Sequence, residues 1–133
     1  MLLVFIVSAL SIMLFYSFLI TINVHKTLDK ENAGKLLRVL FPSYFLTTAI
    51  LSFLALANSL LADKIFDTIL LSLVFLGSII SRQYLVPKIN KERDLQISGK
   101  TDSKKNFAKL HGFSVLVNLV QVILLTILLV KNL

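Results

Sequence analysis

The sequence contains three uncharged runs, each long enough to cross a lipid bilayer, and this feature constrains the fold more than any other. The runs are Met1–Val24, Val39–Ala62 and Leu110–Val130. A transmembrane helix needs about 20 mainly apolar residues. Only 16% of the residues are charged and 56% are hydrophobic, whereas soluble domains carry about 25% charge. The sequence therefore predicts an integral membrane protein.

A fourth span is less obvious, because its uncharged stretch, Thr68–Ser81, has only 14 residues. At the helical rise these residues cover about 21 Å, which is less than the roughly 30 Å of the hydrocarbon core. We therefore expect the helix to extend at both ends, bringing Asp67 and Arg82 toward the membrane. Pro87 predicts where this helix stops or bends, since proline cannot donate a backbone hydrogen bond.

These runs predict an all-α fold, a four-helix transmembrane bundle that forms one domain over residues 1–133. The expected spans are, in chain order, about 1–24, 39–62, 65–86 and 108–131.

Lysine and arginine are distributed unevenly between the two sides of this bundle. Twelve of the 14 lie within residues 24–39 and 82–109, and only Lys64 and Lys131 lie on the other side. Basic short loops stay in the cytoplasm, so we expect both termini outside and a basic cytoplasmic loop between the third and fourth helices. We expect the membrane to be the bacterial inner (cytoplasmic) membrane. The lysines either set the orientation alone or also contact anionic lipid headgroups.

Composition also excludes several functions. The net charge of +7 comes from basic residues between the apolar runs, where membrane topology explains them. Nucleic-acid binding is therefore not predicted. The chain has no cysteine, which excludes disulfides, thiolate metal sites, iron–sulfur clusters and cysteine nucleophiles. The acidic residues nearest a span are Asp63 and Asp67, at the outer boundary, and no catalytic triad or carboxylate pair is apparent. We expect a protein that is not an enzyme.

Polar residues on the fourth span lie on one helical face. His111, Ser114, Asn118 and Gln121 follow the spacing i, i+3, i+7 and i+10, which predicts a stripe facing the bundle interior. Such residues either form hydrogen bonds between helices or contribute to a site. Arg82 is ionisable and near the membrane, so it either reaches the interface or has a buried functional role.

The predicted orientation brings several polar side chains to the cytoplasmic end of the bundle. Arg82, Tyr44, His111 and Asn118 converge there, with Ser114 on the same stripe as His111. We assign His25 to the headgroup region and not to the site. In this candidate site Arg82 would hold an anionic group and His111 would ligate or donate, while Tyr44 and Asn118 would orient the ligand.

Three segments resemble the family named for transmembrane protein 205, a group of small four-span membrane proteins. They are Leu40–Phe45 (LFPSYF), Ser81–Pro87 (SRQYLVP) and Phe107–Asn118 (FAKLHGFSVLVN); Ile80 departs from the asparagine of the eukaryotic pattern. The resemblance implies a four-helix membrane fold without an established activity. It adds weight to the site residues and to three structural motif residues, Pro42, Pro87 and Gly112. The architecture is more remotely similar to copper-resistance-D and HemJ-type haem-binding proteins.

Two functions from different classes follow. The first is a binding protein that holds haem, a metal ion or a lipid headgroup at the cytoplasmic end of the bundle. The second is a non-catalytic accessory or structural subunit of a larger membrane complex, in which the polar stripe stabilises the bundle and an apolar face meets partner subunits.

Overall fold

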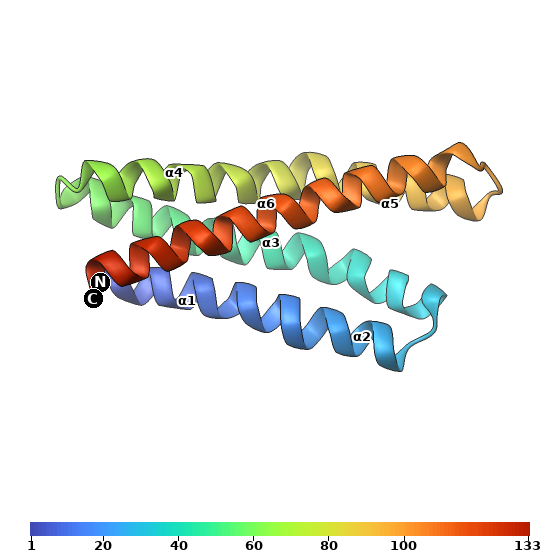
Figure 1. Cartoon of the computed structure of the whole chain (residues 1–133), viewed down its shortest axis with the longest axis horizontal. Coiled ribbons are helices and arrows are strands. Elements are labelled where there is room, and N and C mark those ends of the chain that lie inside the picture. The colour runs from blue at the N-terminus through green and yellow to red at the C-terminus, as the bar shows by residue number, and fades with distance from the viewer.

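A computed structural model of residues 1–133 contains four long helical runs that pass back and forth along one axis (Figure 1). All four are long and apolar enough to cross a membrane, as predicted. Both termini lie at the same end of the bundle. The first run joins α1 (Leu2–Leu14), η1 (Phe15–Ile20) and α2 (Thr21–Thr27); the second is α3 (Lys30–Leu61); the third joins α4 (Ile65–Ile80), η2 (Ser81–Leu85) and α5 (Val86–Ile97); the fourth is α6 (Asp102–Asn132).

The segments predicted as loops at the basic end are mostly helical. Helix α3 starts at Lys30, well before the expected span at residue 39, and α6 starts at Asp102. Only short turns separate the runs there, and Gly99 has a φ of +94° in the second of them, a conformation that glycine adopts without strain. The basic segment between the third and fourth spans is therefore a helical hairpin rather than a loop.

The start of α3 is fixed by Asp29, which is its N-cap. The Asp29 carboxylate accepts hydrogen bonds from the backbone N–H groups of Asn32 and Glu31, each at 3.0 Å, and from the Asn32 side chain at 2.7 Å. These bonds, led by that of the Asn32 backbone, hold the pKa of Asp29 below its ordinary value, because they favour the ionised form. A residue outside the predicted span thus sets where the second helix begins.

The third helix does not stop at Pro87, which was one of the two outcomes that the sequence predicted there. It continues through α5 to Ile97. The turn before the proline, η2, is π-helical, and the Val86 N–H donates to the carbonyl of Ser81, five residues back. Pro87 then occupies one of the first positions of α5, where its missing N–H is tolerated.

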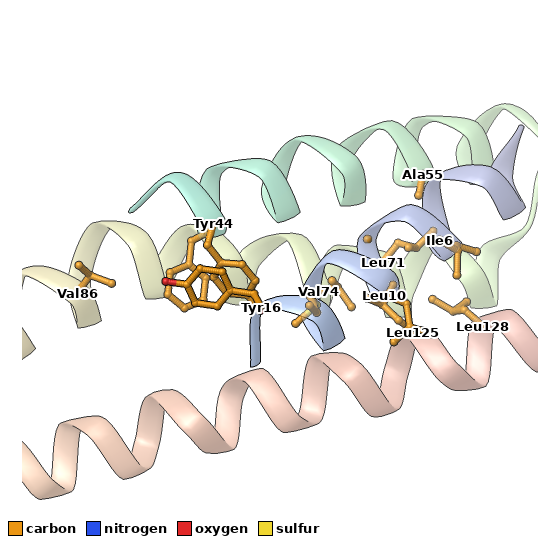
Figure 2. Close-up of a cluster of buried hydrophobic side chains, with 13 residues drawn as sticks. Ile6, Leu10, Tyr16, Tyr44, Ala55, Leu71, Val74, Val86, Leu125 and Leu128 are labelled. Atoms are coloured by element: carbon orange, nitrogen blue, oxygen red, sulfur yellow. The ribbon is translucent and has the colours of Figure 1, made fainter. Parts of the chain in front are cut away.

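The core lies along the bundle axis where all four runs meet. Figure 2 shows its buried side chains, from Ile6 and Leu10 of α1 to Leu125 and Leu128 of α6. Buried polar side chains also link the helices at mid-height. Gln121 Nε2 donates to the Val74 carbonyl at 2.7 Å and to Ser78 Oγ at 2.9 Å. Interhelical hydrogen bonds of this kind are one of the two alternatives that the sequence left open for the stripe.

The end of the bundle that carries the termini is held by an ion pair. Asp67, near the start of α4, is fully buried. Its carboxylate accepts from Lys131 Nζ at 2.6 Å and from Asn132 Nδ2 at 3.1 Å. The end of α6 therefore neutralises this fully buried carboxylate.

Candidate ligand-binding cavity

A cavity of about 540 Å³ lies toward the opposite, basic end of the bundle. This volume falls within the range of small-molecule sites in proteins. Residues of five elements line the cavity: η1, α2, α3, α5 and α6. Its wall contains Tyr16, Ser17, Thr21, His25, Lys30, Leu37, Arg38, Phe41, Tyr44, Phe45, Val86, Ile89, Asn90, Arg93, Phe107, His111, Ser114, Val115 and Asn118.

The inner wall of the cavity is aromatic. The rings of Tyr16 and Tyr44 stack with centroids 4.3 Å apart, and Figure 2 shows them overlapping at the end of the core nearest Val86. Phe41 lies 5.5 Å from Tyr16, and Phe45 lies 4.8 Å from Tyr44, measured between ring centroids. These contacts continue the hydrophobic core, so a ligand reaching this depth would meet an apolar surface.

A short chain of hydrogen bonds crosses the cavity wall. Tyr44 Oη donates to Asn118 Oδ1 at 2.5 Å, and Asn118 Nδ2 donates to Ser17 Oγ at 3.2 Å. Asn118 thus joins α3, η1 and α6. The hydroxyl of Tyr16, by contrast, is buried without any hydrogen-bond partner. The two stacked tyrosines therefore have opposite hydrogen-bonding states.

The wall nearer the basic end is cationic. Lys30, Arg38 and Arg93 line the cavity beside the two histidines, His25 and His111, and none of its lining residues is acidic. Arg38 is neutralised by Asp94, with Nη2 2.6 Å from Oδ1. Lys30 and Arg93 take part in none of the ion pairs of the chain. Positive charge at this wall is therefore only partly compensated by the protein.

Arg93 is held in a layered arrangement. On one side it packs so closely against Gly34 that an added Cβ there would lie 2.6 Å from Nη1. On the other side its guanidinium faces the Phe107 ring, 5.3 Å from the centroid. Phe107 in turn stacks on His111, with centroids 5.8 Å apart and rings nearly parallel. The stack positions Arg93 without pairing its charge.

The structure brings most of the predicted site residues together. Tyr44, His111, Ser114 and Asn118 all line the cavity, while Arg82 does not. Arg82 is half-buried, and its Nε donates to the Pro42 carbonyl at 3.3 Å. Neither proline motif residue lines the cavity: Pro42 lies inside α3, and Pro87 lies at the start of α5. An added Cβ on Gly112 would meet nothing within 4 Å, so that glycine is not required for packing within the chain.

The π-helical turn explains why Arg82 misses the cavity. In a regular α-helix Arg82 would stand four residues before Val86, on the same face. The five-residue hydrogen bond of η2 places Ser81 there instead. The same change occurs in η1, where the Thr21 N–H donates to the carbonyl of Tyr16. Two π-helical turns thus lie beside the inner end of the cavity, and such turns recur at functional sites.

Sequence reasoning missed several cavity residues. His25 lines the cavity although we assigned it only to the headgroup region, and Tyr16, Lys30 and Arg93 were not considered. One signal was available in α5, because Val86, Ile89, Asn90 and Arg93 follow the spacing i, i+3, i+4 and i+7 of a single helical face. For Tyr16 the only local signal is the adjacent Ser17, because the other residues around it are apolar.

The residues present limit which cofactors the cavity would hold. No three His, Cys, Asp or Glu side chains come close enough together to bind a metal ion. The two histidines of the chain, His25 and His111, both line the cavity, and either is a chemically suitable axial ligand for haem.

The fold and this cavity define a class: a four-helix integral membrane protein with a polar and aromatic cavity near one end of the bundle. Within that class the chain belongs to the uncharacterised family described as Domain of unknown function (DUF4149), whose family model matches residues 4–97. The matched region includes the first three helical runs, and α6 lies outside it. No curated protein and no solved structure matches the chain.

Proposed function

We propose that this protein binds a small ligand in the cavity at the basic end of the transmembrane bundle. The observation that carries the proposal is the cavity itself, which four of the five side chains selected from sequence line together. Its aromatic inner wall and its cationic outer wall provide apolar contact and charge in one site, as ligand sites commonly do.

The proposal includes an orientation in the membrane. Twelve of the 14 basic residues belong to the end with the cavity or the segments that lead to it, and both termini lie at the other end. The tendency of lysine and arginine to remain in the cytoplasm supports a cytoplasmic cavity with outward termini. We propose the bacterial inner membrane as the location.

A cavity-filling pair of variants tests the proposal. Ser114→Trp places an indole in the cavity, whereas Leu116→Trp places it on an exposed face of the same helix. We expect native mass spectrometry of the purified protein to show a bound small molecule that Ser114→Trp removes and Leu116→Trp retains. A protein that carries no bound molecule, with both variants behaving alike, would refute ligand binding.

The resemblance to the transmembrane protein 205 family is part of this proposal. Its motif residues Tyr44, His111, Ser114 and Asn118 lie in the cavity wall, which supports a shared site in that family. Haem is one ligand that the two histidines suit. Absorbance of the purified protein in the Soret region, lost in His111→Ala, would identify it.

The accessory-subunit role is the second candidate. Helix α6 is the least buried of the four spans, so its apolar face is the surface that a partner subunit would cover. Crosslinking in membranes distinguishes the two candidates, because a subunit would be captured repeatedly with the same partner. In both roles we propose that the protein is not a catalyst, because no catalytic triad or carboxylate pair is apparent in the sequence.

A further inference from the structure

We infer that the ligand is an anionic amphiphile of the bilayer, which enters the cavity sideways between α2 and α6. The inference rests on the proposed ligand binding. It specifies that the ligand carries negative charge, that it has an apolar part and by which route it enters the cavity. Three independent features of the cavity support it: its unbalanced charge, its apolar depth and the separation of the two helices.

The unbalanced charge favours an anionic ligand. Lys30 and Arg93 line the cavity without an ion-pair partner, and no acidic side chain lines it with them. A partly buried guanidinium gains from a bidentate carboxylate or phosphate. Gly34 and Phe107 hold Arg93 from two sides, so the guanidinium is positioned in advance for such a group.

The apolar lining at the inner end of the cavity favours a ligand that also has an apolar part. Beyond the cationic wall the lining becomes the aromatic cluster of Tyr16, Phe41, Tyr44 and Phe45. A free phosphate ion would leave this surface without contact, whereas an acyl chain attached to the anionic group would cover it. The order of the two surfaces, cationic outside and apolar inside, matches the polarity of a lipid at the membrane interface.

The route follows from how the first and fourth helices separate. The bond from Asn118 to Ser17 ties η1 to α6 at 3.2 Å. Farther toward the basic end α2 is not packed closely against α6, and their ribbons run apart (Figure 1). Thr21 and His25 line one side of the cavity and His111 and Ser114 the other. We therefore place the entrance of the cavity between these two helices, which face the surrounding lipid.

The absence of tryptophan from the chain allows a direct test. Phe41→Trp places a single fluorophore in the cavity wall, and Phe53→Trp places one on an exposed face of the same helix. Each variant is reconstituted in nanodiscs of phosphatidylcholine containing a minor fraction of phosphatidylglycerol, with bromine on the acyl chains of one lipid at a time. Bromine quenches indole fluorescence only at short range, so quenching reports which lipid occupies each position.

We expect brominated phosphatidylglycerol to quench the fluorescence of Phe41→Trp more strongly than its mole fraction in the bilayer predicts. The expected preference over phosphatidylcholine at this position is about fivefold. Quenching of Phe53→Trp should follow the mole fraction. Arg93→Gln should abolish the preference at position 41. Gly34→Ala should reduce it, because the new methyl group would meet only Arg93 side-chain atoms and displace the guanidinium from this position. Ile89→Trp, also in the cavity wall, serves as the reporter if Phe41→Trp does not fold.

Three results would overturn the inference. Quenching in proportion to mole fraction at position 41 would show no selection for an anion. A lack of quenching by either lipid would show that acyl chains do not enter. Displacement of phosphatidylglycerol by inorganic phosphate would show that a soluble anion suffices. In each case a bound molecule that Ser114→Trp still removes would leave the proposed ligand binding intact.

Discussion

The two stacked tyrosines of the cavity wall differ in the hydrogen bonding of their hydroxyl groups. Tyr44 Oη is bonded to Asn118, while Tyr16 Oη is buried and bonded to nothing. A buried hydroxyl without a partner keeps its desolvation cost, and a paired one recovers it. The same chemical change should therefore have opposite effects at two positions whose rings are in contact.

We predict that Tyr16→Phe stabilises the ligand-free protein and that Tyr44→Phe destabilises it, each by about 1 kcal/mol. The second variant loses a hydrogen bond and leaves Asn118 Oδ1 unpaired. Reversible unfolding in mixed micelles, followed by circular dichroism, measures both. Destabilisation by Tyr16→Phe in protein that retains its ligand would mean that the ligand, and not the protein, pairs with this hydroxyl.

At the level of the helices, substitution of two glycines distinguishes the effect of packing within the bundle from the effect of helix propensity. A Cβ on Gly77 of α4 would lie 2.9 Å from Gln121 Nε2, whereas a Cβ on Gly112 of α6 would meet nothing. The Gln121 side chain is buried and held by two hydrogen bonds. It therefore cannot move aside without losing them.

We predict that Gly77→Ala costs about 1–3 kcal/mol of unfolding free energy, because the added methyl group overpacks this contact. Gly112→Ala should be neutral or stabilising by up to about 1 kcal/mol through its better helix propensity. The two variants control for each other in the same unfolding assay. Equal effects would show that Gly77 does not admit the Gln121 side chain.

The number and type of helices could be predicted from the sequence, because long uncharged runs permit little else in a membrane. The stripe of α6 was also predictable, since its spacing is that of a regular helix. The position of Arg82 could not be predicted, because one π-helical turn places Ser81, and not Arg82, on the face of the helix that carries Val86. The long N-terminal extension of α3 could not be predicted either. It depends on the Asp29 cap, which lies outside every apolar run and well before the expected start of the span at residue 39.

For the whole molecule, the cysteine-free sequence makes the orientation easy to test. Ala62→Cys places a thiol in the turn between α3 and α4, and Ser98→Cys places one in the turn between α5 and α6, at the other end. We predict that a membrane-impermeant maleimide labels Ala62→Cys in intact bacterial cells but labels Ser98→Cys only after permeabilisation. The reverse pattern would place the cavity on the outer side of the membrane.

The ion pair at the far end of the bundle has a consequence for biogenesis. Asp67 belongs to the third span, and the lysine that neutralises it is synthesised 64 residues later. While the ribosome is still making the fourth span, the only cation near this carboxylate is Lys64 of the preceding turn. The carboxylate then lies at the edge of the hydrocarbon without its ion-pair partner, and such a group is costly there. We therefore expect α4 to reach its final depth only after Lys131 emerges, which makes insertion of the last two spans a single coupled event.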